Sequence, residues 1–310
     1  MYKNLLDKII EYDDIVIFRH IKPDGDCMFS ALALFQFIKD NFKNKKVKIA
    51  GEEIYDIISR NDKVSDNFIR KALVIVVDTA TGARIDDQRY QNGAYIIKID
   101  HHPIIEQYGD LNIVDSSAAS CTQILASIFF SKAFKDLYLS EKVCEYLYCG
   151  LVTDTINLRT TNTASRTLSI ASKLVKRGQL NISDLVEYVT DIDLDTYQKV
   201  TRIRTHLQVK EHFGYIILDE ADLQALGMSG TEAKNNIDEI GKIKDLNIWA
   251  FAVENKSRYD VSVRSKRGYK INDSCSRYKG GGHANAAAAK QLEKGDLDAL
   301  FQELVELSTK

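Results

Sequence analysis

Several acidic and imidazole side chains stand in short groups that are suited to binding metal ions or transferring protons. They are His20, Asp24, Asp26, Asp78, Asp100, His101, His102 and Asp154. Any single aspartate among them has a simpler explanation, such as the cap of a helix. Carboxylates crowded into a few residues repel one another, however, unless a cation offsets their charge. The groups together therefore predict a cation site, if the fold brings them to one place.

Three of these groups directly follow runs of β-branched residues that are typical of buried strands. Residues 14–19 lead into His20, residues 72–77 lead into Asp78, and residues 94–102 end in the sequence Asp-His-His. The carboxyl ends of parallel strands share one edge of an open α/β sheet, and ligands bind at that edge. We therefore expect the three groups to converge. The spacing between the runs leaves room for right-handed crossovers.

Helical patterns accompany the remaining groups. The turn after His20 carries two aspartates and is followed by an apolar helical pattern at residues 28–38. Asp154 ends a strongly apolar helix predicted for residues 141–153, where an unpaired carboxylate would be costly to bury. A metal ion is the simplest partner for it. No glycine-rich dinucleotide fingerprint and no P-loop follows any strand, which disfavours a nucleotide-cofactor domain.

The chain changes character after about residue 212, where short strands and turns begin. Strand patterns recur there, at residues 214–219, 247–254 and 258–265. Two features of this part suggest phosphate binding. Arg264 can grip a phosphate with its planar guanidinium, and the Gly-Gly-Gly-His sequence at residues 280–283 lets backbone N–H groups approach an anion closely.

These patterns predict an α/β protein of two domains. We expect a catalytic domain at residues 1–190, with a mostly parallel sheet flanked by helices and a helical or irregular stretch from about residue 50 to 70. A helical linker at residues 191–210 would join it to a smaller α+β domain with a mixed sheet, at residues 211–310.

Composition limits the classes of function. The 310 residues are 45% hydrophobic and 28% charged, with a formal net charge of -2, which argues against non-specific binding to duplex DNA. The N-terminus does not resemble a signal peptide, and no apolar run has the length of a membrane span. We interpret the five cysteines as reduced thiols of a cytoplasmic protein, neither paired in disulfides nor grouped in a zinc motif: Cys27, Cys121, Cys144, Cys149 and Cys275.

The motifs, in this order, resemble those of the DHH phosphoesterase family with its DHH-associated C-terminal domain. They are His20-x-x-x-Asp24-x-Asp26, Asp78, Asp100-His101-His102, Asp154, and the loop Gly280, Gly281, Gly282 and His283. The resemblance covers nearly the whole chain. The compact two-domain form is similar to the NrnA-like bifunctional oligoribonucleases that are also pAp phosphatases. It implies hydrolysis of nanoRNA and linear dinucleotides such as pApA to 5′-mononucleotides, and of pAp to AMP.

The resemblance also implies roles for the site residues. Two Mn²⁺ ions, with Mg²⁺ or Co²⁺ as alternatives, would activate a bridging hydroxide. The ligands of one ion would be His20, Asp24 and Asp78, and those of the other Asp26, Asp78, His101 and Asp154. Asp100 would support the site without binding an ion, and His102 would face the scissile phosphate. Arg264 and the loop at residues 280–283 would hold the far end of a short single-stranded oligonucleotide or of pAp.

Some residues depart from the family pattern, and other functions stay open. Cys27, Met28 and Phe29 are atypical of the first motif, Ile156 stands where a glycine is common, and Ala288 replaces another glycine. An inorganic pyrophosphatase shares the N-terminal motifs, but would be expected to lack the Gly-Gly-Gly-His loop. A nucleotide-binding module without catalysis is a further alternative, which the retention of every implied ligand disfavours. The oligomeric state is open, with a homodimer as one alternative.

Overall fold

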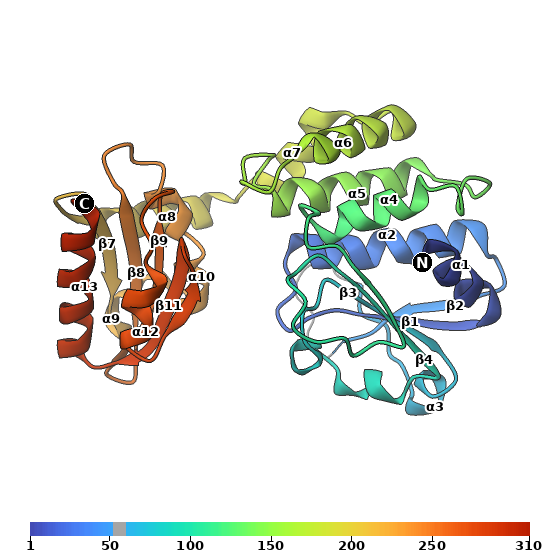
Figure 1. The fold of residues 1–310 in the computed structure, drawn as a ribbon, viewed down its shortest axis with the longest axis horizontal. Helices are drawn as coiled ribbons and strands as arrows, with labels where there is room; N and C mark the ends of the chain where they lie inside the picture. The colour runs from blue at the N-terminus through green and yellow to red at the C-terminus, as the bar shows by residue number, and fades with distance from the viewer. Residues whose placement is uncertain (52–59) are drawn as a thin grey trace. The chain divides into compact units, whose positions relative to one another are not determined.

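The computed structural model describes residues 1–51 and 60–310, which form two compact units, Met1–Asp191 and Ile192–Lys310 (Figure 1). Residues 52–59, in the predicted helical or irregular stretch, lie outside the described residues. The predicted linker contains α8 (Leu194–Thr205) and β6 (Gln208–Lys210), and Ile203 of α8 is buried in the core of the second unit. The division into catalytic domain, linker and substrate-binding domain stays a prediction.

The first unit contains a parallel five-stranded sheet in the order β2-β1-β3-β4-β5. Its strands are β1 (Asp14–Phe18), β2 (Lys46–Ile49), β3 (Leu73–Val77), β4 (Tyr95–Asp100) and β5 (Leu111–Val114). Every neighbouring pair is parallel, which confirms the predicted sheet. Because β1, β3 and β4 are adjacent, the residues that follow them emerge side by side at one edge.

Alternate side chains of these strands enter two different cores, as a sheet covered on both faces requires. Ile15, Ile17 and Ile75 pack with the larger helical layer, whereas Val16 and Val74 pack on the opposite face. The larger layer contains α1 (Tyr2–Glu11), α2 (Gly25–Asn41), α4 (Cys121–Phe129), α5 (Glu141–Asp154), α6 (Ser165–Gly178) and α7 (Ile182–Thr190). Shorter helices contribute to the opposite face: α3 (Asp66–Ile69), η1 (Gly82–Arg84) and η2 (Gln88–Asn92).

The second unit contains a mixed six-stranded sheet in the order β10-β11-β9-β8-β7-β6. Besides β6, its strands are β7 (Phe213–Leu218), β8 (Ile248–Asn255), β9 (Arg258–Ser265), β10 (Gly281–His283) and β11 (Ala286–Leu292). Only β7 and β8 pair in parallel among the neighbouring strands described, so the predicted mixed sheet is confirmed.

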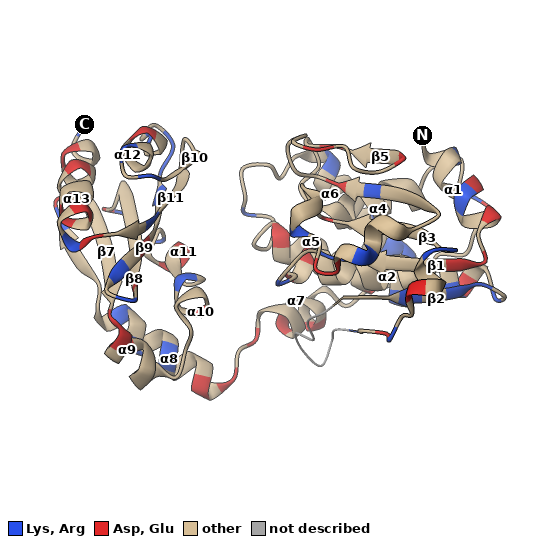
Figure 2. Ribbon diagram, turned by 90° about the horizontal axis from the view of Figure 1, so that it is seen from below, with Lys and Arg blue, Asp and Glu red and all other residues tan. Residues whose placement is uncertain are grey.

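Helices cover each face of this second sheet. On one face, Trp249 and Phe251 of β8 form a core with three short helices, α9 (Glu220–Leu226), α10 (Gly230–Lys234) and α11 (Ile237–Ile240). Ala250 and Ala252 face the opposite core, with α12 (Asn272–Arg277) and α13 (Lys294–Ser308). Basic and acidic residues are interspersed along both units (Figure 2). Among the described residues, no helix combines the length and apolarity needed to cross a bilayer.

One local prediction differs from the structure. The sequence predicts a glycine loop at residues 280–283, but Gly281–His283 form strand β10, which pairs in antiparallel register with β11. Glycine is a poor strand former, so a run of glycines does not predict a strand. Close packing accounts for the choice of glycine, because a Cβ atom at Gly280 would lie 2.1 Å from the Ala288 carbonyl oxygen.

Candidate metal centre

Asp78 lies at the centre of the cluster at the edge of the first sheet. It follows β3, it is 2% exposed, and its Oδ1 lies 3.4 Å from His101 Nε2 and 3.7 Å from His102 Nδ1. Its Oδ2 lies 3.7 Å from His20 Nε2. The backbone of Asp78 is left-handed, with φ of 53°, a conformation that Asp and Asn tolerate better than most residues. This turn directs one carboxylate toward three imidazoles.

The turn after β1 provides His20 and Asp24. His20 Nε2 lies 3.7 Å from Asp24 Oδ1, and the same carboxylate caps α2 by accepting a hydrogen bond from the Cys27 amide at 3.1 Å. Burial lowers the pKa of His20, but Asp24 and Asp78 outweigh this effect and raise the pKa well above its usual range. The first turn of α2 is thus fixed to the imidazole by a shared carboxylate.

Asp26, His101 and Asp154 form the second part of the cluster, and each offers a ligand atom within 4.8 Å of the others. Both oxygens of Asp26 accept hydrogen bonds from the start of α4. The Cys121 amide donates to Oδ2 at 2.6 Å, and the Thr122 amide and hydroxyl donate to Oδ1 at 3.0 and 2.7 Å. This helix N-terminus holds Asp26 in place by hydrogen bonds and by its dipole.

Small residues allow the elements to meet here. A Cβ atom on Gly25 would lie 2.6 Å from Thr153 Oγ1, so glycine lets the start of α2 approach the end of α5. A Cβ atom on Gly150 would lie 2.4 Å from the Thr122 side chain and 3.1 Å from Asp26 Oδ1. These two glycines bring Asp26 and Asp154 toward the same space.

The turn that follows Asp154 has an unusual backbone. Ile156, Asn157 and Leu158 are consecutive residues in the left-handed region, with φ of 47°, 57° and 63°. This conformation costs about 1–2 kcal/mol for most L-residues and is worst for β-branched ones. The Ile156 side chain is 49% exposed and gains little from packing in return.

We expect Ile156→Gly to raise the free energy of unfolding by about 0.5–1 kcal/mol. Glycine adopts positive φ without steric cost, and the greater flexibility of glycine in the unfolded chain offsets part of this gain. Urea denaturation measures the difference. Ile156→Ala is the matched control, since it removes the side chain and keeps Cβ. A glycine variant no more stable than the alanine variant would contradict the assignment of strain to this backbone.

The charges of the cluster are consistent with a cation site. Burial and the neighbouring carboxylates raise the pKa of Asp154 to about 6 and that of Asp26 well above its usual range. Burial lowers the pKa of His101, but Asp78 and the other carboxylates raise it to about 10. Oδ1 of Asp78 accepts no well-directed hydrogen bond from any described residue. These shifts arise because carboxylates and imidazoles are crowded into one buried place, and such oxygen and imidazole donors suit divalent cations.

Asp100 and His102 form a separate unit beside the cluster. His102 Nδ1 lies 2.7 Å from Asp100 Oδ1, and Lys98 Nζ lies 3.1 Å from Asp100 Oδ2. Burial raises the pKa of Asp100, but its bonds to His102 and the charge of Lys98 lower the pKa to about 2. Asp100 is therefore ionised at neutral pH. The sequence analysis did not predict this ion pair, although the presence of Lys98 within an apolar strand could have indicated it.

The sequence prediction also missed two contributors to the cluster. The Thr122 hydroxyl and amide hold Asp26, and nothing in the sequence marks Thr122 as part of a site. The sequence indicates only that Cys27 is a reduced thiol, yet its Sγ lies within 4.8 Å of ligand atoms of both His20 and Asp78. The other predicted N-terminal residues do converge on one edge of the sheet.

The predicted phosphate-binding residues lie on the second sheet. Arg264 of β9 is in register with Ala286 of β11, which is in register with His283 of β10, so the three side chains share one face. Neighbouring strands lie about 4.8 Å apart, which separates Arg264 and His283 by about 10 Å at the backbone. The small Ala286 between them leaves room above the sheet. Arg264 Nε also lies 3.9 Å from Asp238 Oδ1.

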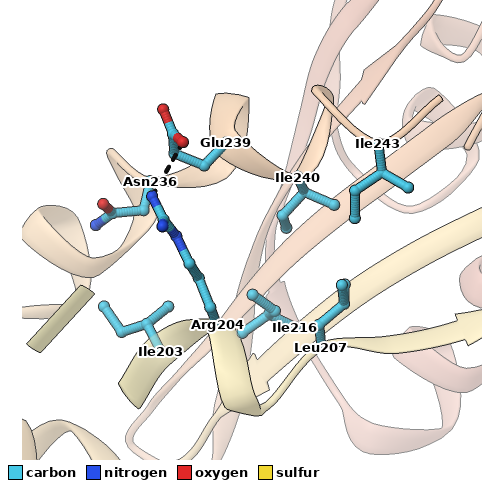
Figure 3. Close-up of a pocket in the computed structure, with 8 residues that line it drawn as sticks. All are labelled: Ile203, Arg204, Leu207, Ile216, Asn236, Glu239, Ile240 and Ile243. Atoms are coloured by element: carbon cyan, nitrogen blue, oxygen red, sulfur yellow. Dashed lines mark hydrogen bonds and ion pairs between the residues drawn. The ribbon is translucent and has the colours of Figure 1, made fainter. Parts of the chain in front are cut away.

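A cavity of about 230 Å³ in the second unit contains none of the predicted site residues (Figure 3). It is mostly apolar and lined by Ile203, Arg204, Leu207, Ile216, Asn236, Glu239, Ile240 and Ile243. Its cationic group, Arg204, forms an ion pair with Glu239 at 3.0 Å (Figure 3). The cavity therefore offers no free charge to a phosphate.

Comparison with known proteins agrees with this geometry. The model of the DHH family, N-terminal domain, matches residues 14–151, and the model of the DHHA1 domain matches residues 217–309. The first match contains β1, β3 and β4 with the polar residues that follow them. The chain belongs to the DHH family. The resemblance to this family that the sequence shows is confirmed.

The chain is also similar to proteins that cover nearly its whole length. It is 36% identical to a probable bifunctional oligoribonuclease and PAP phosphatase NrnA of Streptococcus mutans, over 99% of this chain and 98% of that one. It is 31% identical to the bifunctional oligoribonuclease and PAP phosphatase NrnA of Bacillus subtilis, over 98% and 97%. The fold also matches an exopolyphosphatase-related protein of Bacteroides fragilis, with a TM-score of 0.84, 20% identity and coverage of 98% and 95%.

Proposed function

We propose that this DHH-family protein is a metal-dependent phosphodiesterase and phosphatase that hydrolyses short oligonucleotides to 5′-mononucleotides and pAp to AMP. The observation that carries the proposal is the convergence of carboxylates and imidazoles on Asp78, whose Oδ1 lacks a hydrogen bond from the described residues. The full-length similarity to proteins named as oligoribonucleases and PAP phosphatases supports the substrate class.

In this proposal Asp78 would help to hold both cations, which we expect to be Mn²⁺ in view of the oxygen and imidazole donors. The ligands of one would be His20, Asp24 and Asp78, and those of the other Asp26, Asp78, His101 and Asp154. When bound, such ions supply Lewis acidity at the reacting phosphate. Asp100 orients His102 through its Nδ1, which leaves the Nε2 atom to meet the substrate phosphate.

The second unit supplies remote binding in this proposal. Arg264 and His283 would hold a base or phosphate beyond the scissile bond, with Ala286 between them on the same sheet face. Gly281 and Gly282 would offer backbone donors at the adjoining edge, whereas the Gly280 N–H donates to the Cys275 carbonyl oxygen at 3.0 Å. Binding energy from such groups orients the reacting phosphate at the metal centre.

A substrate panel tests the proposed function. Purified protein with Mn²⁺ is assayed on pAp, pApA, a five-nucleotide RNA and pyrophosphate, and the products are separated by chromatography. We expect AMP from the first two substrates, 5′-mononucleotides from the RNA, and no turnover of pyrophosphate. Chelation should abolish activity, and Mn²⁺ should restore it more fully than Mg²⁺ or Co²⁺. Turnover of pyrophosphate alone, or full activity after chelation and dialysis, would overturn the proposal.

The two neighbouring histidines should differ in their response to substitution. His101→Ala should lower the bound metal, because His101 Nε2 lies near both Asp78 and Asp154. His102→Ala should keep the metal and lower turnover about 10²-fold, because this side chain is held by Asp100 and is more exposed. Metal analysis of both variants is the measurement. Equal metal loss would show that His102, which also lies near Asp78, is a ligand as well.

Arg264→Ala should lower kcat/KM for pAp and pApA by about 10-fold or more, the loss of a charge-assisted contact worth about 1.5–3 kcal/mol. Arg258→Ala is the matched control, since Arg258 lies on the same strand and pairs with Glu293. A small chromogenic phosphodiester should be hydrolysed at nearly the original rate. The same loss with that substrate would place Arg264 in the reaction or in the stability of the fold.

A further inference from the structure

A thiol lies in the metal centre where the sequence gave no reason to expect one. Cys27 occupies the first turn of α2, and its Sγ, an imidazole nitrogen of His20 and a carboxylate oxygen of Asp78 all lie within 4.8 Å of one another. Cys27 is fully buried, His20 is 5% exposed and Asp78 is 2% exposed. This group has the donor types and the spacing of a three-ligand cation site.

The surroundings of the thiol leave it available for such a role. Its Sγ lies 3.8 Å from the Val77 carbonyl oxygen, which is a long contact. Asp78 is shared by both sides of the cluster: its Oδ2 lies 3.7 Å from His20 Nε2, and its buried Oδ1, which has no hydrogen-bond partner among the described residues, lies 3.4 Å from His101 Nε2.

We propose that Cys27 is a ligand of the cation on the His20 side of the cluster, so that the two metal positions differ in preference. The inference rests on the proposed metal-dependent function. A thiolate with one imidazole and carboxylates favours Zn²⁺, Co²⁺ or Fe²⁺, whereas the position of Asp26, His101 and Asp154 has only oxygen and nitrogen donors and suits Mn²⁺ or Mg²⁺. On coordination the thiol releases its proton to solvent, and sulfur then donates an electron pair to the ion.

Cobalt spectroscopy tests the ligand directly. Metal-free protein is titrated with Co²⁺ while near-ultraviolet absorption is recorded and bound cobalt is counted by elemental analysis. The original protein should show a thiolate-to-cobalt charge-transfer band. Cys27→Ser should retain bound cobalt and lose the band. Cys149→Ser is the matched control, since Cys149 is a buried thiol of α5 outside the three-ligand group, and it should keep the band.

A competition experiment measures the preference. Original protein and variant are equilibrated with Zn²⁺ and Mn²⁺ together, and the bound ions are counted. Cys27→Ser should reduce the preference for Zn²⁺ over Mn²⁺ by at least about 10-fold, since even indirect partners of a metal change affinity by 10–100-fold. Circular dichroism checks the fold, and Cys27→Ala provides a second variant if the serine protein unfolds.

The outcomes separate this inference from the proposed function. Protein that binds cobalt and hydrolyses pApA but shows no charge-transfer band would overturn the cysteine ligand alone. A band that persists in both Cys27 variants would do the same. Protein that binds no cobalt, Zn²⁺ or Mn²⁺ would overturn both the cysteine ligand and the proposed function. Original protein that shows the band but does not hydrolyse pApA would overturn only the proposed function.

Discussion

Asp78→Asn is expected to reduce the rate of pApA hydrolysis by about 10³-fold or more. Lewis-acid stabilisation of the transition state is worth several kcal/mol, and each loss of about 1.4 kcal/mol lowers the rate tenfold. Asp78 is the carboxylate that approaches His20, His101 and His102, at 3.7, 3.4 and 3.7 Å. In the proposed function it would help to hold both cations. Its removal should therefore disturb two ions at once, whereas loss of any other ligand disturbs one.

Asparagine is the informative replacement at this position. It keeps nearly the same shape and tolerates the left-handed backbone of Asp78, so the fold should persist. Metal analysis should find at most one tightly bound ion in the variant. Asp115→Asn is the matched control, because Asp115 follows β5 at the same edge but pairs with Arg166. An Asp78→Asn enzyme that retains near-original turnover would refute this role in holding both cations.

Lys98→Met is expected to lower the free energy of unfolding by about 3–5 kcal/mol, as removal of one partner of a buried ion pair does. Lys98 and Asp100 are both fully buried, with Nζ and Oδ2 3.1 Å apart. Lys98 Nζ also donates to the carbonyl oxygens of Ala80 at 2.8 Å and Glu106 at 3.0 Å. The variant loses these bonds and leaves the Asp100 carboxylate buried without its counter-charge.

Urea denaturation of four proteins separates these contributions. Lys98→Met, Asp100→Asn and the double variant form a cycle with the original protein, and the double variant should be more stable than the sum of the single losses predicts. Lys48→Met is the matched control on the same sheet, since Lys48 bonds the Lys63 carbonyl at the surface, and it should change stability by less than about 0.5 kcal/mol. Equal effects of Lys48→Met and Lys98→Met would contradict the ion-pair interpretation.

The sequence predicted the parallel sheet and its polar edge because several signals agreed there. The strands before His20, Asp78 and Asp100 are continuous β-branched runs, and a run covered on both faces leaves few alternatives. Each run ends at a residue that is costly to bury alone. The carboxyl ends of parallel strands lie at one edge of the sheet whatever the strand order, so convergence of the groups could be inferred without coordinates.

Other contacts depend on information that local sequence does not carry. Thr122 meets Asp26 because α4 begins beside α2, a placement that arises from packing over almost a hundred residues of chain. Strand β10 forms because β11 pairs with it, although Gly281 and Gly282 have low strand propensity. The proximity of Cys27 to Asp78 depends on the angle at which α2 leaves the turn after β1. Periodicity predicts which face a residue occupies, but such tertiary contacts decide its partner.

The span of the cluster along the chain has a consequence for biosynthesis. His20 and Asp78 precede Asp154, which lies at the end of α5 and close to the middle of the sequence. At about 5–20 residues per second, the ribosome needs about 4–15 s to extend the chain from Asp78 to Asp154. During that interval the nascent chain carries most of the carboxylates without the last one. In the proposed function, complete metal loading therefore waits until α5 has left the ribosome and docked on α2.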